Sequence, residues 1–167
     1  GAEAAAGGGS SAALPPLPDG VAVVDGDASL AEECTAIERM CFPAREAMCL
    51  RTELSQRGAA LVCAVVGEAQ ERRCVGYVVT QRNSLALVIA KLVVHPAHRR
   101  QGIGRRLLAH AIELGRASRA QLCMLHVDED NAPATALYLG MGFQQAGIRR
   151  DFYLPGQHAL IMQLEFS

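Results

Sequence analysis

Short apolar runs separated by turn residues dominate the first half of the chain. The β-branched run Val21–Val24 is ended by Asp25-Gly26, and Leu61–Val66 is a second apolar run. Both patterns predict strands. A polar turn over residues 67–73 then leads into a return strand at Cys74–Thr80, and Leu85–Val94 reads as a long strand that Pro96 ends. We therefore expect four strands before residue 96.

Helical spacing appears in four places. Asp27 or Ser29 can cap a helix that runs to about residue 41, where Pro43 follows, and residues 46–56 predict a second helix closed by Gly58. A third helix is predicted from residue 102 to about 118, and a short one over 131–139 is ended by glycine. The apolar residues of the third helix share one broad face: Ile103, Leu107, Leu108, Ala111, Ile112 and Leu114.

Three more strands complete the pattern, at about 121–127, 143–148 and 159–166. The resulting order is β-α-α-β-β-β-α-β-α-β-β, which predicts an α/β fold with a mixed sheet flanked by helices. Residues 1–20 are rich in Gly, Ala and Pro and are expected to form a flexible tail. Residues 21–167 are expected to form one domain.

The composition narrows the function classes. The 167 residues carry a formal net charge of −1, so the whole chain offers no electrostatic case for binding nucleic acid or a membrane. No apolar run approaches the roughly 20 residues that span a bilayer. The six cysteines form no CxxC pair and no zinc-like spacing with His, so we expect reduced thiols and no metal. An intracellular, cytoplasmic protein is expected, and a removed targeting peptide stays open because the first residue is not Met.

A basic turn between the strand at 85–94 and the helix from 102 is the most informative stretch. A helix N-terminus offers unpaired N–H groups and a partial positive charge, which together bind anions. Two glycines allow phosphate oxygens to approach closely, and three arginines add positive charge. The candidate phosphate-binding residues are Arg99, Arg100, Gln101, Gly102, Ile103, Gly104 and Arg105.

Other phosphate-binding and nucleic-acid-binding motifs fit this turn less well. The chain holds no GxxxxGK[ST] string, and the third glycine of a GxGxxG fingerprint is replaced by Leu107. A basic nucleic-acid patch would usually interleave aromatic residues, and none occur among these arginines. The alternative without a ligand is an ordinary helix start that tolerates glycine, with arginines exposed to solvent. The succession of a strand, a proline, a basic turn and an amphipathic helix favours the phosphate site over this alternative.

These residues resemble the Gcn5-related N-acetyltransferase superfamily. Its [QR]-x-x-G-x-[GA] motif matches Arg99–Gly104 after Val94-His95-Pro96, and its N-x-x-A-x-x-L-Y-x-x-x-G-F block matches Asn131–Phe143. The resemblance covers about residues 21–167 and comes nearest to protein amino-terminal acetyltransferases, including the bacterial ribosomal-protein alanine enzymes. It implies a mostly antiparallel twisted sheet with splayed central strands, and acetyl-CoA as cofactor.

The resemblance also implies roles for single residues. Pantetheine would bond to the backbone of Leu92, Val93 and Val94, where an N–H can polarise the thioester carbonyl. Tyr138 matches the general acid that protonates the departing sulfur. Asn131 and Ala134 match cofactor contacts, although Asn131 serves equally well as a helix N-cap.

A general base is needed on the strand beside this gap, and His126 occupies that position. An imidazole with a pKa near 6.5 suits base catalysis at neutral pH. A structural sheet histidine is the alternative, with Asp128 and Glu129 as reserve bases. A weak base suits an α-amine, whose pKa of about 7.7–8.0 leaves more of it neutral than a lysine with about 10.4.

Substrate contacts are expected from two loops. Phe42, Pro43 and Glu46 follow the first helix, and Tyr153, with Phe152, lies in the final hairpin. The resemblance implies that these residues hold a protein or peptide N-terminus. A lysine or small-molecule amine as acceptor, and a non-catalytic acyl-CoA-binding module, stay open as alternatives, as does the oligomeric state.

Overall fold

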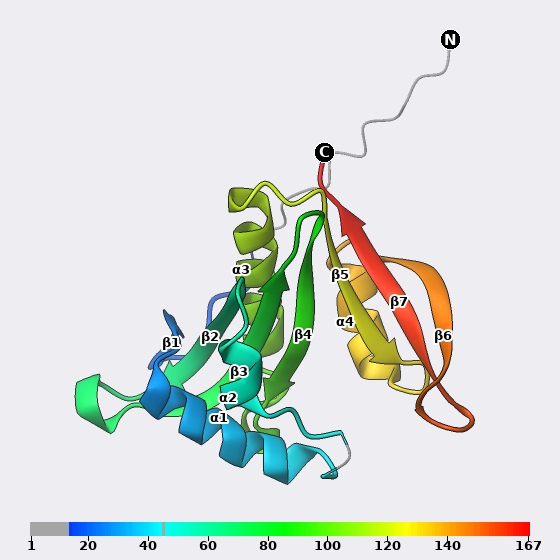
Figure 1. The fold of residues 1–167 in the computed structure, drawn as a ribbon. Helices are drawn as coiled ribbons and strands as arrows, with labels where there is room; N and C mark the ends of the chain where they lie inside the picture. Colours follow the sequence, from blue (N-terminus) through cyan, green and yellow to red (C-terminus); the bar gives the residue numbers. More distant parts are fainter. Residues whose placement is uncertain (1–13, 45) are drawn as a thin grey trace.

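A seven-stranded sheet organises the chain, in the order β1-β2-β3-β4-β5-β7-β6 (Figure 1). The computed structural model describes residues 14–44 and 46–167. All neighbouring strands are antiparallel except β4 and β5. The strands are β1 Val21–Asp25, β2 Ala59–Val66, β3 Arg73–Arg82, β4 Ala86–Val94, β5 Leu122–Asp128, β6 Gln144–Leu154 and β7 Gln157–Glu165. The expected mixed sheet and element order are confirmed.

Four helices cover the two faces of this sheet. They are α1 Ala28–Cys41, α2 Leu50–Leu54, α3 Ile103–Ala117 and α4 Ala132–Gly140, with single 3-10 turns at Ala69–Glu71 and Pro96–His98. Successive side chains of β2 point to opposite faces of the sheet, which gives a helical layer on each face. Leu61, Cys63 and Val65 pack with α1 and α2, whereas Val62 and Ala64 pack with α3. Among the described residues, no helix is both long and apolar enough to cross a bilayer.

The second helix is shorter than its sequence predicts. Residues 46–49 leave the helix because tertiary hydrogen bonds hold them: Lys91 Nζ donates to the Glu46 carbonyl at 3.0 Å, and Met48 N donates to Glu38 Oε2 at 3.3 Å. Long-range contacts therefore override the local propensity of this segment. The consequence is an irregular α1–α2 loop held against β4.

The segment 14–20, expected to belong to a flexible tail, lies against α3. Leu17 packs on the core, and the Pro15 carbonyl accepts a hydrogen bond of 2.8 Å from Arg106 Nη2. The first part of the expected tail, residues 1–13, lies outside the described residues.

Candidate active site

Strands β4 and β5 separate in the middle of the sheet (Figure 1). They pair in parallel only between Ala86–Ile89 and Leu122–Leu125. The register of β4 against β3 shifts at the same point, where Val79 faces Lys91 and Thr80 faces Ile89, so that Ala90 is a bulge residue. Bulges bend a strand and often lie beside active sites. The backbone of β4 beyond Ile89 therefore presents one edge to a ligand and not to β5.

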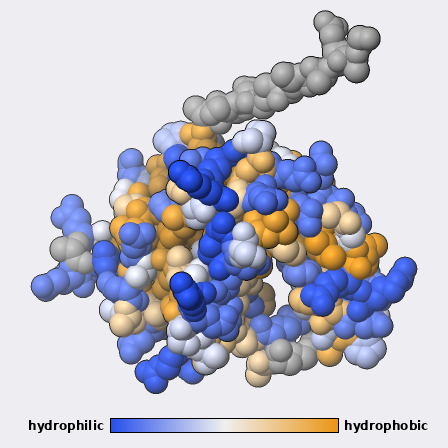
Figure 2. Space-filling view, turned by 45° about the horizontal axis from the view of Figure 1, so that its top comes forward, coloured by the Kyte–Doolittle hydropathy of each residue, from blue (hydrophilic) through white to orange (hydrophobic). Residues whose placement is uncertain are grey.

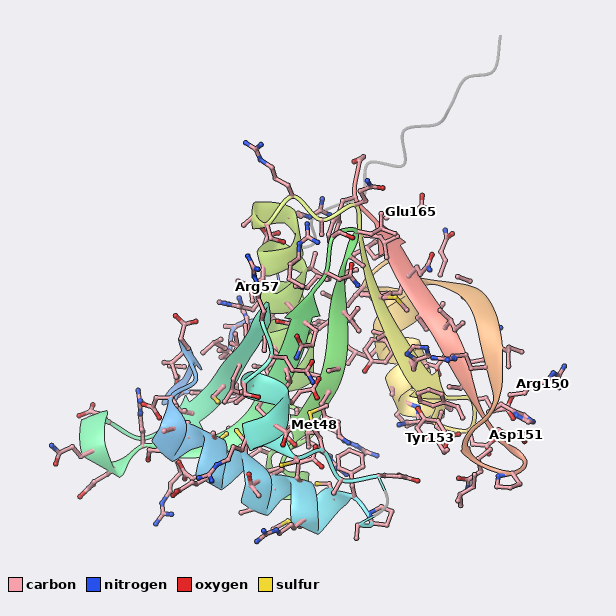
Figure 3. All side chains as sticks on the ribbon, viewed as in Figure 1. Met48, Arg57, Arg150, Asp151, Tyr153 and Glu165 are labelled. Carbon is pink, nitrogen blue, oxygen red and sulfur yellow. The ribbon has the colours of Figure 1, made fainter. Side chains whose placement is uncertain are left out.

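A groove with a volume of about 1010 Å³ lies in this opening. A hollow is visible in the space-filling view of Figure 2. Figure 3 shows Met48 and Tyr153, which line the groove from opposite sides of the gap. Eight of the expected site residues line it: Phe42, Glu46, Leu92, His126, Asn131, Ala134, Tyr138 and Tyr153.

Three of the expected residues, Pro43, Val93 and Val94, do not line the groove, and the Val94 side chain packs on the α3 side of the sheet. The Pro43 carbonyl accepts hydrogen bonds from the backbone N–H groups of Glu46 and Ala47, so this residue shapes the turn and lies outside the groove lining. The Val93 side chain is buried in the core beneath α1. Only the backbone of Val93 is therefore available to a ligand on the groove side.

The basic turn has the backbone of an anion site. Arg100 and Gly102 both have positive φ, 63° and 81°, and Gly102 begins α3 without a side-chain cap from any described residue. The N–H groups of this first turn have no intrahelical partner, and no described residue accepts a hydrogen bond from them. A Cβ on Gly104 would meet Val94 and Leu137 only at van der Waals distances of 3.5 and 3.8 Å. The fold alone does not require glycine there, which fits a site that a phosphate approaches.

Two exposed arginines of this turn contact neighbouring elements. Arg99 Nε donates to the Val94 carbonyl at 3.1 Å, and its Nη2 lies 3.7 Å from Cys41 Sγ. Arg99 therefore joins the end of β4 to α1. Arg105 Nη2 lies near Gly140 at the end of α4, 3.5 Å from where a Cβ would stand.

Asn131 begins α4 and lines the groove at the same time. Its Oδ1 accepts a hydrogen bond of 3.2 Å from Ala134 N, which is the N-cap arrangement. Its place in the groove leaves a cofactor contact open as well.

Tyr138 lies deep in the groove, with 8 % of its surface exposed. Burial, followed by the charge of Tyr153, raises the pKa of Tyr138 to about 12. Phe143 supports its ring at a centroid distance of 5.9 Å. The phenol therefore stays protonated at neutral pH and can donate a proton.

His126 lies on β5 just beyond the last residue paired with β4. Its ring stacks on Phe152 at 4.8 Å with an interplanar angle of 11°. Burial, followed by the positive charge of Arg149, lowers the pKa of His126. The imidazole is therefore neutral at pH 7 and can accept a proton.

Buried charges support the groove wall, and the sequence analysis did not identify them. Glu38 on α1 is 1 % exposed, and its Oε1 lies 3.4 Å from Lys91 Nζ. The same ammonium lies 3.7 Å from the Phe42 ring centroid. A lysine within the apolar strand LVIAKLVV and a glutamate on the apolar face of α1 were the available signals.

Carboxylates dominate the charged lining of the groove. Asp128 and Glu46 both raise the pKa of Tyr153 after burial, to about 12, which places both carboxylates near its hydroxyl. Of the two reserve bases, Asp128 lines the groove, whereas Glu129 is exposed and outside the lining.

Comparison with known proteins identifies the family. The model of the acetyltransferase (GNAT) family matches residues 31–143. The chain belongs to this acetyltransferase family. The expected N-acyltransferase activity is therefore confirmed at the level of the family.

Several known acetyltransferases are similar to this chain in sequence or in structure. The [ribosomal protein bS18]-alanine N-acetyltransferase of Escherichia coli (strain K12) is 37% identical over 102 residues, covering 59% of this chain and 68% of the relative. The crystal structure of the Escherichia coli ribosomal-protein-S18-alanine N-acetyltransferase aligns with a TM-score of 0.74 at 26% identity, covering 88% of this chain and 94% of that chain. Streptothricin acetyltransferase of Streptomyces lavendulae is 39% identical over 82 residues, which cover 47% of this chain and 43% of that relative.

Proposed function

We propose that this acetyltransferase moves an acetyl group from acetyl-CoA to the α-amino group of a protein or peptide N-terminus. The observation that carries the proposal is the open groove between β4 and β5. A proton donor, Tyr138, and a proton acceptor, His126, line this groove together with both loops expected to hold a peptide.

Acetyl-CoA, the donor that membership of this family implies, supplies the acetyl group as an activated thioester. The N–H groups at the start of α3, with Arg100 and Arg105, would hold its diphosphate. The open backbone edge of Leu92–Val94 would hold its pantetheine arm. Asn131 and Ala134 would contact the cofactor from the first turn of α4.

Two residues handle the protons. Tyr138 keeps its proton at neutral pH and would deliver it to the leaving sulfur. His126 would take a proton from the attacking amine, directly or through water, because its imidazole is neutral. An α-amine needs little help from a base, since its pKa lies near neutrality.

The acceptor would enter between the α1–α2 loop and the β6–β7 hairpin. Phe42 and Glu46 line the groove from the first of these, and Tyr153 lines it from β6. A peptide backbone can bond to the Tyr153 hydroxyl, and the Glu46 carboxylate can attract the incoming ammonium. The alanine N-acetyltransferases among the relatives, which are named for acting on a ribosomal protein, support this choice of acceptor.

A small cationic amine is the second candidate acceptor, favoured by the likeness to streptothricin acetyltransferase. Acetyl transfer from labelled acetyl-CoA to streptothricin and to short peptides, half of them blocked at the N-terminus, distinguishes the acceptors. We expect label only on peptides with a free N-terminus. Label on blocked peptides that contain lysine, or on streptothricin alone, would replace the proposal with the corresponding alternative.

A further inference from the structure

Three buried thiols meet beneath α1, on the face of the sheet opposite α3. Cys34 Sγ lies 3.6 Å from Cys63 Sγ and 3.6 Å from Cys74 Sγ. All three sulfur atoms lie within 4.8 Å of one another. Their residues are 0%, 0% and 8% exposed and come from three elements, α1, β2 and β3. The proposed acetyl transfer makes no use of them.

The fold brings these residues together from distant positions. Cys34 lies on the buried face of α1, whereas Cys63 and Cys74 lie on adjacent antiparallel strands. The β2–β3 register shifts between Ala64 and Val65, and Val75 is left without a partner. This bulge places Cys74 on the same face as Cys63. The spacing along the chain therefore gave no CxxC signal, although the thiols are close in space.

The spacing of the sulfur atoms suits a three-coordinate ion. With ion–sulfur bonds of about 2.3 Å, the value for zinc thiolates, a separation of 3.6 Å corresponds to an angle of about 103° at the ion. Two of the three angles at the ion, those that include Cys34, would therefore be pyramidal, and the Cys63–Cys74 separation is within 4.8 Å. Among the described residues, the group of possible ligands holds the three thiols and no fourth His, Cys, Asp or Glu. A tetrahedral zinc site would need such a fourth ligand.

The charge balance of the buried cluster also favours a trivalent ion. Hydrogen bonds with Cys63 and Cys74, and then burial, raise the pKa of Cys34 well above its ordinary value. The Cys74 thiol donates to the Gly76 carbonyl at 3.2 Å. A divalent ion on three thiolates would leave one uncompensated negative charge in the core, which is costly. A trivalent ion leaves none.

We propose that Cys34, Cys63 and Cys74 form a binding site for a trivalent thiophilic ion of the arsenic(III) class. Arsenous acid exchanges its three hydroxyl groups for three thiols: As(OH)₃ + 3 RSH → As(SR)₃ + 3 H₂O. Three S–H and three As–O bonds break, three As–S and three O–H bonds form, and no oxidant or net proton release is needed. The product is neutral and fits an apolar environment.

A route to the cluster starts at Cys74. A surface hollow lined by residues of α1 and by residues 70–73 lies next to it. Glu33 lines this hollow and accepts a hydrogen bond of 3.4 Å from Cys74 N through its Oε1. Local opening of α1 from the sheet would then expose the remaining thiols.

The test is incubation of the reduced protein with sodium arsenite, followed by native mass spectrometry. We expect one arsenic per chain, with a mass gain of one arsenic atom less three hydrogens, and a higher melting temperature. Cys34→Ala and Cys63→Ala should each weaken arsenite binding at least tenfold. Cys123→Ala, at a buried thiol outside the cluster, and Cys49→Ala, at an exposed one, should bind like the wild type.

Circular dichroism and CoA binding would verify that each variant is folded. Loss of only two hydrogens, or unchanged arsenite binding in both cluster variants, would overturn the three-thiol site. Tighter binding of Zn²⁺ than of arsenite in the same assay would contradict the proposal that the site prefers a trivalent ion. Because the readouts are mass and melting temperature, the result does not depend on the acetyl-transfer proposal.

Discussion

Lys91 Nζ and Glu38 Oε1 form an ion pair of 3.4 Å between β4 and α1, and the side chains are only 15% and 1% exposed. Glu38 also accepts the Met48 N–H, and Lys91 donates to the Glu46 carbonyl. One buried charge pair therefore fixes the α1–α2 loop at the wall of the groove. No second cation pairs with Glu38 among the residues that the structure describes, so its charge depends on Lys91.

Removal of Lys91 should destabilise the protein strongly. Lys91→Met leaves the Glu38 carboxylate buried without its partner, which should cost about 3 kcal/mol of the free energy of unfolding. Adding Glu38→Gln should recover part of that loss. Urea denaturation of both single variants and the double variant measures the coupling. Arg73→Met, which breaks an exposed pair with Glu33, is the control and should change stability little.

Features that depend on residues close together along the chain could be predicted from the sequence, whereas features that depend on contacts between distant segments could not. The element order depends on local periodicity and was predicted from it, whereas the splayed central strands were implied by the family resemblance. The binding of phosphate by the turn at residues 99–105 stays a prediction. The length of α2 was wrong because residues 46–49 bond to β4 and α1. The Lys91–Glu38 pair and the cluster of Cys34, Cys63 and Cys74 join distant segments. The sequence places Lys91 and Glu38 on apolar faces, but no local pattern indicates which distant residues meet.

Loss of the Tyr138 hydroxyl should abolish most turnover. Tyr138→Phe removes a proton donor that burial keeps protonated, and kcat should fall at least about 100-fold while CoA binding is retained. Tyr153→Phe is the matched control, expected to raise KM for the peptide more than it lowers kcat. Steady-state kinetics together with calorimetric CoA titration measure both. An unchanged kcat in Tyr138→Phe would exclude Tyr138 as the proton donor, whereas CoA binding without any turnover in the wild type would support a non-catalytic binding module.

The pH dependence should report His126. Because burial and Arg149 favour its neutral form, the pH profile of kcat/KM should have an inflection below the ordinary imidazole pKa of about 6.5, separate from that of the α-amine near 7.7–8.0. Arg149→Gln removes a positive charge, which makes protonation easier and should move the inflection to higher pH. Arg150→Gln is the control, since Arg150 points away from the body of the molecule in Figure 3. Equal profiles for both variants would favour a structural His126.

The phosphate-binding turn can be tested by comparing two arginines that have the same strained backbone conformation, one inside the turn and one far from it. Arg100 and Arg119 are non-glycine residues with positive φ, 63° and 58°. Arg100→Gly and Arg119→Gly should each relieve about 1 kcal/mol of strain and raise the melting temperature. Only Arg100→Gly should weaken CoA binding, because Arg119 follows the far end of α3. Equal CoA affinities for the two variants would place the diphosphate elsewhere.

The charge of the groove should select basic acceptors. Among the described residues, four carboxylates line it, from Glu46, Glu53, Asp128 and Asp130, whereas the ammonium of Lys91 is paired with Glu38. A peptide with arginine at its second position should therefore have a higher kcat/KM than one with glutamate there, and added salt should reduce the difference. Asp130→Asn should narrow the gap about two- to fivefold, as expected for a partly exposed charge pair. Glu129→Gln, an adjacent charge outside the lining, should leave it unchanged, and equal use of both peptides by the wild type would show that these carboxylates do not select the acceptor.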